Sequence, residues 1–170
     1  MKNTLQNNNF RFELPDNQST RDFQWQVTDV SIPSISISET SISMPKLQNL
    51  RMPASAVTYG DVDIEFLMDA DFQAYNNVYK WMMSIINTTS NHQDIDPTNT
   101  VEKDAILYII DATGDRIVTA FKFFGLFPTN LAPLNFTYGE AGAIDAVTCN
   151  VTFSFREMKL LDNQMTALIS

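Results

Sequence analysis

Three carboxylates spaced two residues apart are the part of the sequence most able to support chemistry. Asp61, Asp63 and Glu65 alternate with apolar residues in the segment 61–66. On a β-strand this alternation places the three carboxylates on one face, where they could bind a cation. The segment lacks the glycine and the ligand spacing of a calcium-binding loop, so we interpret it as the solvated face of a strand. A metal-dependent enzyme that uses these acids is the weakest alternative.

The single histidine and the single cysteine do not form a catalytic constellation. His92 lies in the polar segment 88–100, where a general base would need an oriented partner that the sequence does not supply. Cys149 alternates with Val147 and Val151, which predicts a buried thiol rather than a nucleophile. The sequence also contains no phosphate-binding glycine loop, no nucleophile elbow and no Cys/His metal pattern. We expect a protein that is not an enzyme and that needs no cofactor and no metal.

Length, composition and charge predict one globular domain over residues 1–170. The chain has 170 residues, of which 44% are hydrophobic and 18% are charged, which is enough for an independent core. Acidic residues outnumber basic residues 20 to 11, and the net charge of −9 argues against a protein that grips nucleic acid. No apolar run approaches the roughly 20 residues of a membrane span, and the N-terminus has no apolar signal region. We expect no membrane insertion, and a single cysteine suits a reducing compartment.

Alternation of apolar and polar residues with a period of two is the dominant pattern, and it predicts strands with one buried face. The clearest strand covers residues 147–155. Its apolar members, which should face the core, are Val147, Cys149, Val151, Phe153 and Phe155. A second strand covers residues 34–38, where Ser and Ile alternate, and a change of phase before Ile42 predicts a bulge near Glu39 and Thr40. Residues 104–111 and 116–124 should form a hairpin, because Gly114 lies between them.

A single helix is expected over about residues 71–87, with Asp71 at its N-terminus as a cap or first-turn acid. Its predicted apolar stripe consists of Phe72, Tyr75, Tyr79, Met82 and Ile86. Weaker strands at residues 10–14, 23–30 and 135–138 bring the expected number of strands to about eight. The predicted fold class is therefore mainly β, an antiparallel β-sandwich or barrel with one flanking helix.

The segment 44–57 is expected to be a loop, because Pro45 and Pro53 cannot donate to a sheet and the segment is too long for a hairpin connection. A surface loop without a partner seldom carries several large apolar side chains. The segment therefore either folds back on its own subunit or contacts another one. The candidate contact residues are Met44, Lys46, Leu47, Leu50, Arg51 and Met52.

The segment 124–131 carries a motif with a family resemblance. Its residues are Gly125, Leu126, Phe127, Pro128, Thr129 and Asn130. Together with the final strand, this segment resembles the C-terminal third of phage tail-tube proteins of the contractile-tail type. The order of the upstream elements is similar as well: N-terminal strands, a long loop, a strand, one amphipathic helix and a hairpin. Residues 1–9 and 159–170 are interpreted as short extensions past the part that resembles the family.

The resemblance implies a specific fold and assembly. Two antiparallel sheets with one flanking helix would form the subunit, six copies would close into a ring, and stacked rings would form a hollow tube that carries DNA. Injection-system and type VI secretion tubes share this fold. The implied partners are further copies of the chain and the tail sheath, baseplate, tape-measure and tail-terminator proteins, while genome DNA passes without specific binding. The implied location is the tail of the virion, assembled in the cytoplasm of a host bacterium.

Small hydroxyl and amide residues on the polar strand faces suit the lining of such a water-filled channel, although plain solvent exposure would explain them too. The candidate lining residues are Asp61, Asp63, Glu65, Ser34, Ser36, Ser38, Thr148, Asn150, Thr152 and Ser154. We therefore expect a structural virion protein, the major tail-tube subunit. The alternatives are a tube-initiating baseplate subunit or a terminator subunit of the same fold, and a monomeric β-sandwich that binds a ligand between its long loops.

Overall fold

The computed structural model describes residues 9–14, 27–42, 50–85, 102–114, 116–134, 136 and 146–162, and every structural statement below concerns these residues. They contain nine strands and one helix. In chain order the elements are β1 (Phe10–Glu13), β2 (Val27–Val30), β3 (Ile35–Ile42), β4 (Leu50–Tyr59), β5 (Val62–Leu67), α2 (Gln73–Ile85), β6 (Lys103–Ile110), β7 (Ile117–Leu131), β8 (Thr148–Ser154) and β9 (Glu157–Leu161).

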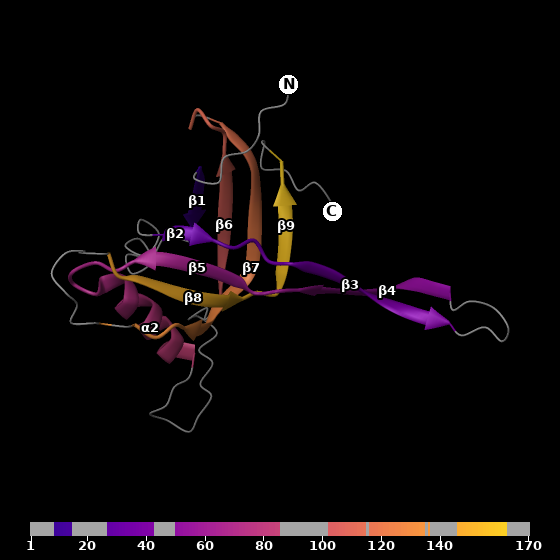
Figure 1. The fold of residues 1–170 in the computed structure, drawn as a ribbon, viewed down its shortest axis with the longest axis horizontal. Coiled ribbons are helices and arrows are strands. Elements are labelled where there is room, and N and C mark those ends of the chain that lie inside the picture. Colours follow the sequence, from indigo (N-terminus) through magenta and orange to yellow (C-terminus); the bar gives the residue numbers. More distant parts are fainter. Residues whose placement is uncertain are drawn as a thin grey trace.

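Two groups of antiparallel strands make up the body of the protein and cross each other (Figure 1). Sheet A contains β1, β6, residues 117–126 of β7, and β9. Sheet B contains residues 127–131 of β7, followed by β8, β5 and β2. The expected mainly β, antiparallel fold with a flanking helix is confirmed, with nine described strands in place of about eight.

Strand β7 belongs to both sheets because it bends at Gly125. This glycine has a φ of 64°, a left-handed conformation that side-chain-bearing residues rarely adopt. Its backbone N–H donates to Oδ1 of Asp104 at 3.3 Å. The chain turns the same corner again between β8 and β9, where the N–H of Arg156 donates to the carbonyl of Phe124 at 2.9 Å and its guanidinium pairs with Glu102. Two neighbouring bends therefore define the angle between the sheets.

The core lies where the two sheets and α2 meet, and both sheets contribute to it. Its largest fully buried side chains are Phe66, Phe123, Phe153, Ile64, Leu107, Leu126, Val62 and Val151. The alternation predicted for the final strand is confirmed at Cys149, Val151 and Phe153, which are all buried. Val147 and Phe155, at the two ends of this segment, are half-buried.

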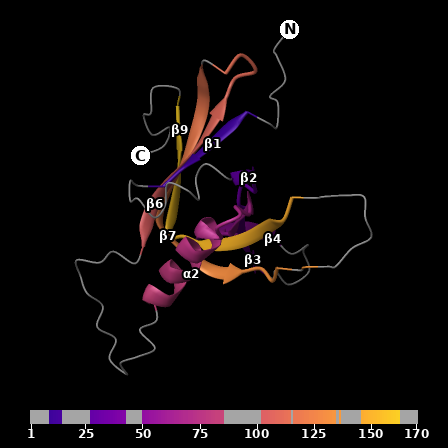
Figure 2. The ribbon, with the colours of Figure 1, turned by 90° about the vertical axis from the view of Figure 1, so that its left-hand side faces the viewer.

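Helix α2 lies across sheet B (Figure 2) and begins at Gln73, two residues later than expected. The Trp81 ring packs 5.6 Å from the ring of Phe153, measured between centroids. The Nζ of Lys103 lies 4.5 Å above the same indole, which ties the end of the helix to the start of β6. Burial lowers the pKa of Lys103.

Two sequence-based expectations for the helix are wrong in detail. The fully buried face consists of Ala74, Val78 and Trp81, whereas Tyr79 from the expected stripe is 48% exposed. The N-terminal acid is Asp69 rather than Asp71. Both oxygens of the Asp69 carboxylate accept hydrogen bonds from the first helical N–H groups, at 3.1 and 3.4 Å. The chain enters the helix through a tight turn. The carboxylate of Asp69, two residues before Asp71, is therefore the one within reach of these N–H donors.

Strands β3 and β4 form a hairpin that projects from the body (Figure 1). The expectation of a loop over residues 44–57 is therefore wrong for residues 50–57, which pair with β3. Residues 43–49, which include Met44, Lys46 and Leu47, lie outside the described residues. The predicted bulge is confirmed, because the register shifts between Ile37 and Glu39. All residues of β3 are exposed.

The remaining expectations concern the ends of the chain and the other turns. The β6–β7 hairpin is confirmed, with Gly114 at a φ of 80° in its turn. Strand β9 was not expected as a separate element, since residues from Lys159 onward were interpreted as an extension. Residues 23–26, 135, 137 and 138 and the whole of 88–100 lie outside the described residues. In the described part of the chain, no helix has the length and apolarity needed to cross a membrane.

We expect Phe153→Ala to lower the free energy of unfolding by about 3–5 kcal/mol, because the side chain has no exposed surface and its loss would leave a cavity. Chemical denaturation of the purified protein measures the change. Phe136→Ala is the matched control, since Phe136 is 67% exposed and its truncation should cost less than about 1 kcal/mol. Equal losses for the two variants would contradict the assigned core.

We expect Gly125→Ala to destabilise the protein more than Gly114→Ala. Both glycines have positive φ, which costs an alanine about 1–2 kcal/mol. A Cβ on Gly125 would also lie 3.0 Å from Oε2 of Glu102 and 3.3 Å from Cβ of Arg156, whereas a Cβ on Gly114 would meet nothing within 4 Å. Thermal unfolding of the two variants separates the cost of crowding at the corner from the cost of φ. A smaller loss at Gly125 would show that the corner can relax.

Candidate functional site

The outer face of sheet B gathers polar side chains from strands that are far apart in the sequence. Asp63 lies directly opposite Thr152, and Glu65 lies opposite Asn150, so each pair shares a face of the sheet. The hydroxyl of Thr152 donates to Oδ1 of Asp63 at 2.7 Å. The residues between them in β5 and β8 point into the core. We call the solvent side of sheet B the polar face.

The strands on either side of β5 and β8 extend this polar face. Asp29 of β2 pairs with Glu65, and the hydroxyl of Thr28 donates to the carbonyl of Glu65 at 3.2 Å. Asn130 of β7 pairs with Thr152, and the hydroxyl of Thr129 donates to the carbonyl of Thr152 at 3.1 Å. Sequence reasoning did not place Thr28 and Asp29 here, because their strand is only four residues long and shows little alternation.

The serines of β3 continue the polar face along the hairpin. Ser36 pairs with Thr58, whereas Ile35 pairs with Tyr59. The ring of Tyr59 contacts that of Phe155 at 5.6 Å between centroids, and Phe155 packs against the core, so Ile35 and Tyr59 lie on the core side. Ser36 therefore lies on the opposite side, in continuity with the polar face.

The structure brings most of the predicted polar residues to one side of the molecule. Asp63, Glu65, Asn150 and Thr152 occupy its centre. Thr148 lies opposite Leu67 at one end of β8, and Ser154 lies opposite Phe127 at the other. Asp61 is exposed immediately before β5. Ser34, Ser36 and Ser38 are exposed in and just before β3.

Basic side chains are absent from the strands of sheet B, whereas acidic side chains occur on both sheets. The strands of sheet B carry Asp29, Asp63 and Glu65 and, within β2, β5, β8 and residues 127–131 of β7, no lysine or arginine. The described basic residues of the body lie mostly on sheet A and its turns. They are Arg11, Lys103, Arg116, Lys122, Arg156 and Lys159. The polar face of sheet B therefore carries negative charge and uncharged hydroxyl and amide groups.

In the described part of the chain, the candidate catalytic and metal-binding residues do not come together in one cluster on this face. Among the described residues, no group of three or more His, Cys, Asp or Glu side chains could hold a metal ion. Cys149 is buried on the core side, and desolvation raises the pKa of its thiol, which disfavours the thiolate. His92 lies outside the described residues. The polar face is a broad surface of hydroxyl, amide and carboxylate side chains.

The motif residues 125–130 act mainly in the fold. Gly125 makes the bend of β7, and Leu126 and Pro128 are buried. Phe127 is half-buried opposite Ser154, while Thr129 and Asn130 end the strand on the exposed side. The motif residues therefore form the part of β7 in which the strand passes from sheet A to sheet B.

The described fold thus combines a strand shared by two crossing sheets, one flanking helix and a polar face whose strands carry no lysine or arginine. Residues 2–160 match the family described as phage tail tube protein, so the chain belongs to that family. The family consists of structural tail proteins, in agreement with the expectation of a non-enzymatic protein.

The chain is also similar to individual tail and tube proteins. The chain is 26% identical over 159 residues to the tail tube terminator protein of Enterobacteria phage T4, covering 90% of this chain and 86% of that protein. Its fold is similar to the tube-terminating cap of the anti-feeding prophage, with a TM-score of 0.69, 15% identity, and coverage of 95% of this chain and 93% of that one. It is also similar to a chain in the extended sheath–tube complex of an extracellular contractile injection system, with a TM-score of 0.67, 14% identity, and coverage of 94% and 92%.

Proposed function

We propose that the chain is the subunit of a hexameric ring in the tube of a contractile phage tail, and that the polar face of sheet B lines its channel. The observation that carries the proposal is the polar face itself, which spans several strands, contains acids and hydroxyls, and lacks cations. Membership of the tail tube family supports a ring subunit over a monomeric ligand-binding module.

The chemistry of the face suits the passage of DNA. Phosphate groups bind to lysine and arginine, and binding strength grows with the number of such contacts. A channel wall with Asp63 and Glu65 and no basic residue repels phosphate instead. Thr152 and Asn150 keep the wall hydrated without attracting charge. DNA would therefore slide along this surface without being held.

The terminal ring of the tube is the position that we favour for this subunit. The T4 relative is a tail tube terminator, and one similar structure is a tube-terminating cap. A second candidate is the repeated major subunit of the tube, favoured by the likeness to a sheath–tube complex. In either position the partners would be further copies of the chain, the tail sheath, the baseplate, the tape-measure protein and, for a major subunit, a terminator. Assembly would take place in the cytoplasm of the host bacterium.

The edges of the sheets support assembly into a ring. Strand β2 ends sheet B on one side, and residues 127–131 of β7 end it on the other. Exposed strand edges present unpaired backbone groups that favour pairing with another chain. A contact between two different edges of identical subunits is heterologous, and it closes into a ring when the rotation between copies permits. The hairpin β3–β4 would add a second contact between subunits.

The location and copy number of the subunit in the virion test the proposed position. A peptide tag on the chain, detected by immunogold electron microscopy of intact tails, should label one end of each tail for a terminal ring. Label along the whole tube would instead identify the major subunit. Absence of the chain from purified tails would contradict both positions.

Replacing Asp61, Asp63 and Glu65 by lysine should allow rings to form but impair the passage of DNA. The acids are exposed or half-buried on the polar face, so their charge is not needed for folding, whereas three lysines per subunit would attract phosphate. DNA ejection from mutant particles is the measurement. The matched control changes the same three residues to asparagine or glutamine, which removes the charge without reversing it. Normal ejection from the lysine variant would show that this face does not line the channel.

A further inference from the structure

The two ends of the molecule carry surfaces that match each other. At one end the β3–β4 hairpin projects beyond the body, and the turn between β5 and α2 lies at the other end (Figure 1). This turn carries the exposed residues Asp71 and Phe72. We propose that the hairpin of one copy docks on the β5–α2 turn of a second copy of this chain. The inference rests on the proposed ring-forming function, and it names the receiving surface for the hairpin.

One side of the hairpin carries large apolar side chains that are about half exposed or more in the described part of the subunit. Ile35 is 59% exposed, Ile37 is 61% exposed, and Val57, which pairs with Ile37, is 50% exposed. These three side chains share a face, because directly opposed residues and residues two apart point the same way. We call them the hairpin apolar face. A two-stranded ribbon of this kind is marginally stable in water, so a partner should cover this face.

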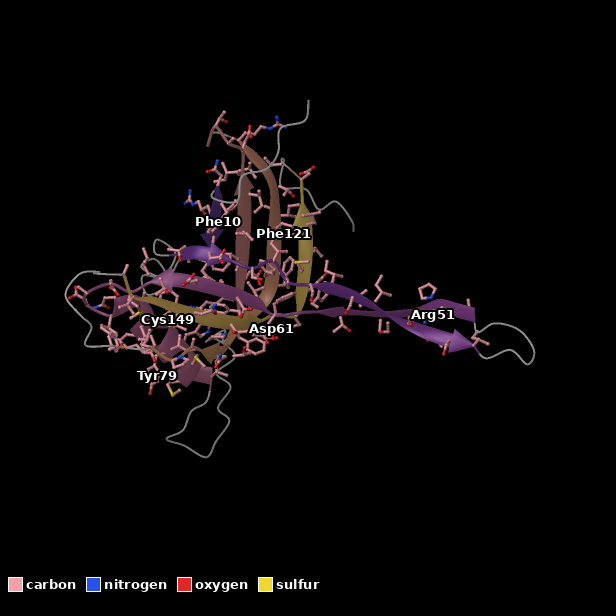
Figure 3. The ribbon with its side chains drawn as sticks, viewed as in Figure 1. Phe10, Arg51, Asp61, Tyr79, Phe121 and Cys149 are labelled. Atoms are coloured by element: carbon pink, nitrogen blue, oxygen red, sulfur yellow. The ribbon has the colours of Figure 1, made fainter. Side chains whose placement is uncertain are left out.

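A basic residue lies further along the same side of the hairpin. Arg51 pairs with Ser41, and it follows the hairpin apolar face by an even number of residues along both strands. Its side chain is 76% exposed and pairs with Glu39 at 3.4 Å (Figure 3). The eight residues of β3 span roughly 26 Å at about 3.3 Å per residue, which carries Arg51 well beyond the body.

The β5–α2 turn, together with Phe136 from the segment after β7, offers apolar and acidic groups in the same combination. Phe136 is 67% exposed and Phe72 is 38% exposed, and their rings lie 6.2 Å apart between centroids. We call these two residues the aromatic pair. Asp71 is exposed beside Phe72, while the Asp69 carboxylate is already engaged by the helix N–H groups. From residue 52 to residue 79 the chain has no lysine or arginine.

The backbone of Phe72 gives an independent reason to assign a role to this turn. Phe72 is the only described non-glycine residue with positive φ, at 56°. A bulky residue in this conformation is strained, and such strain is concentrated at functional sites. The strain keeps an aromatic ring at the surface next to Phe136, where it contributes little to the core of its own subunit.

The two surfaces are complementary in charge and in apolarity. The hairpin apolar face would cover the aromatic pair, and Arg51 would meet the acidic end formed by Asp71. The contact joins opposite ends of identical chains, so it is heterologous. It closes within a ring or continues into a stack according to the rotation between successive copies.

A charge-reversal experiment tests the contact on the full-length protein. Arg51→Glu and Asp71→Arg, each alone, should raise the concentration needed for assembly by about tenfold or more, measured by light scattering after gel filtration and by negative-stain electron microscopy. The double variant should recover assembly, because the pair is restored with reversed signs. Glu39→Gln is the control, since it removes the partner of Arg51 within the hairpin and should leave assembly unchanged.

Phe72→Gly tests the apolar part without harming the subunit. Glycine accepts the positive φ, so the melting temperature of the monomer should hold or rise, while assembly should weaken by about tenfold or more through loss of the ring. Rings of wild-type protein that persist in both single charge reversals and in Phe72→Gly would overturn this inference alone. A wild-type chain that stays monomeric at all concentrations would count against the proposed ring as well.

Discussion

The bend of β7 at Gly125 is the constraint on which the rest of the structure depends. One strand cannot serve two crossing sheets unless it turns sharply, and the positive φ of Gly125 makes the turn. Side chains on the two sides of the bend, Phe123 and Leu126, are both fully buried. The bend thus directs one face of each sheet into a common core, and α2 packs against this core through Trp81.

Because the inner face of each sheet packs into the common core, the outer face of sheet B is exposed to solvent. Its strands are antiparallel and short, so one polar residue follows each apolar one, and the polar face is a direct consequence of the buried one. What the fold does not require is the sign of the charge on that face. Lysine or arginine at positions 63 and 65 would keep this face equally well hydrated. The basic residues of the two sheets nevertheless occur on sheet A. This segregation supports a role for the face that solubility alone does not explain.

The sequence predicted those parts of the structure where local pattern and tertiary environment agree. The alternation in β5 and β8 identified the core at Ile64 and Phe153, since each strand has one buried and one wet face. The aromatic content of α2 misled the prediction, because Phe72 and Tyr79 have the composition of a core stripe but lie at the surface. Periodicity identifies a helix face that something covers, and it does not say whether the cover belongs to the same chain.

The hairpin β3–β4 was missed for a different physical reason. Pro53 argued against a strand, but in a two-stranded ribbon both strands are edges, and a proline is tolerated where its missing N–H would face solvent or at a bulge. The register shift between Ile37 and Glu39 places an irregularity close to this residue. The sequence prediction was therefore wrong about the structure that carries Arg51, and the role of Arg51 as a contact residue stays a prediction.

The orientation of the hairpin also depends on its connection to sheet B. Two backbone hydrogen bonds join the hairpin to sheet B: the N–H of Ser31 donates to the carbonyl of Asp63 at 2.8 Å, and the N–H of Gly60 donates to that of Ser34 at 2.9 Å. The two segments approach closely at Gly60, where a Cβ would lie 2.7 Å from Oγ of Ser34 and would displace that side chain. These bonds continue the alternation of sheet B into the first residues of the hairpin, with Ser36 on one side and Ile35 and Ile37 on the other. The strand register that buries Ile64 therefore also sets the orientation of the β3–β4 hairpin.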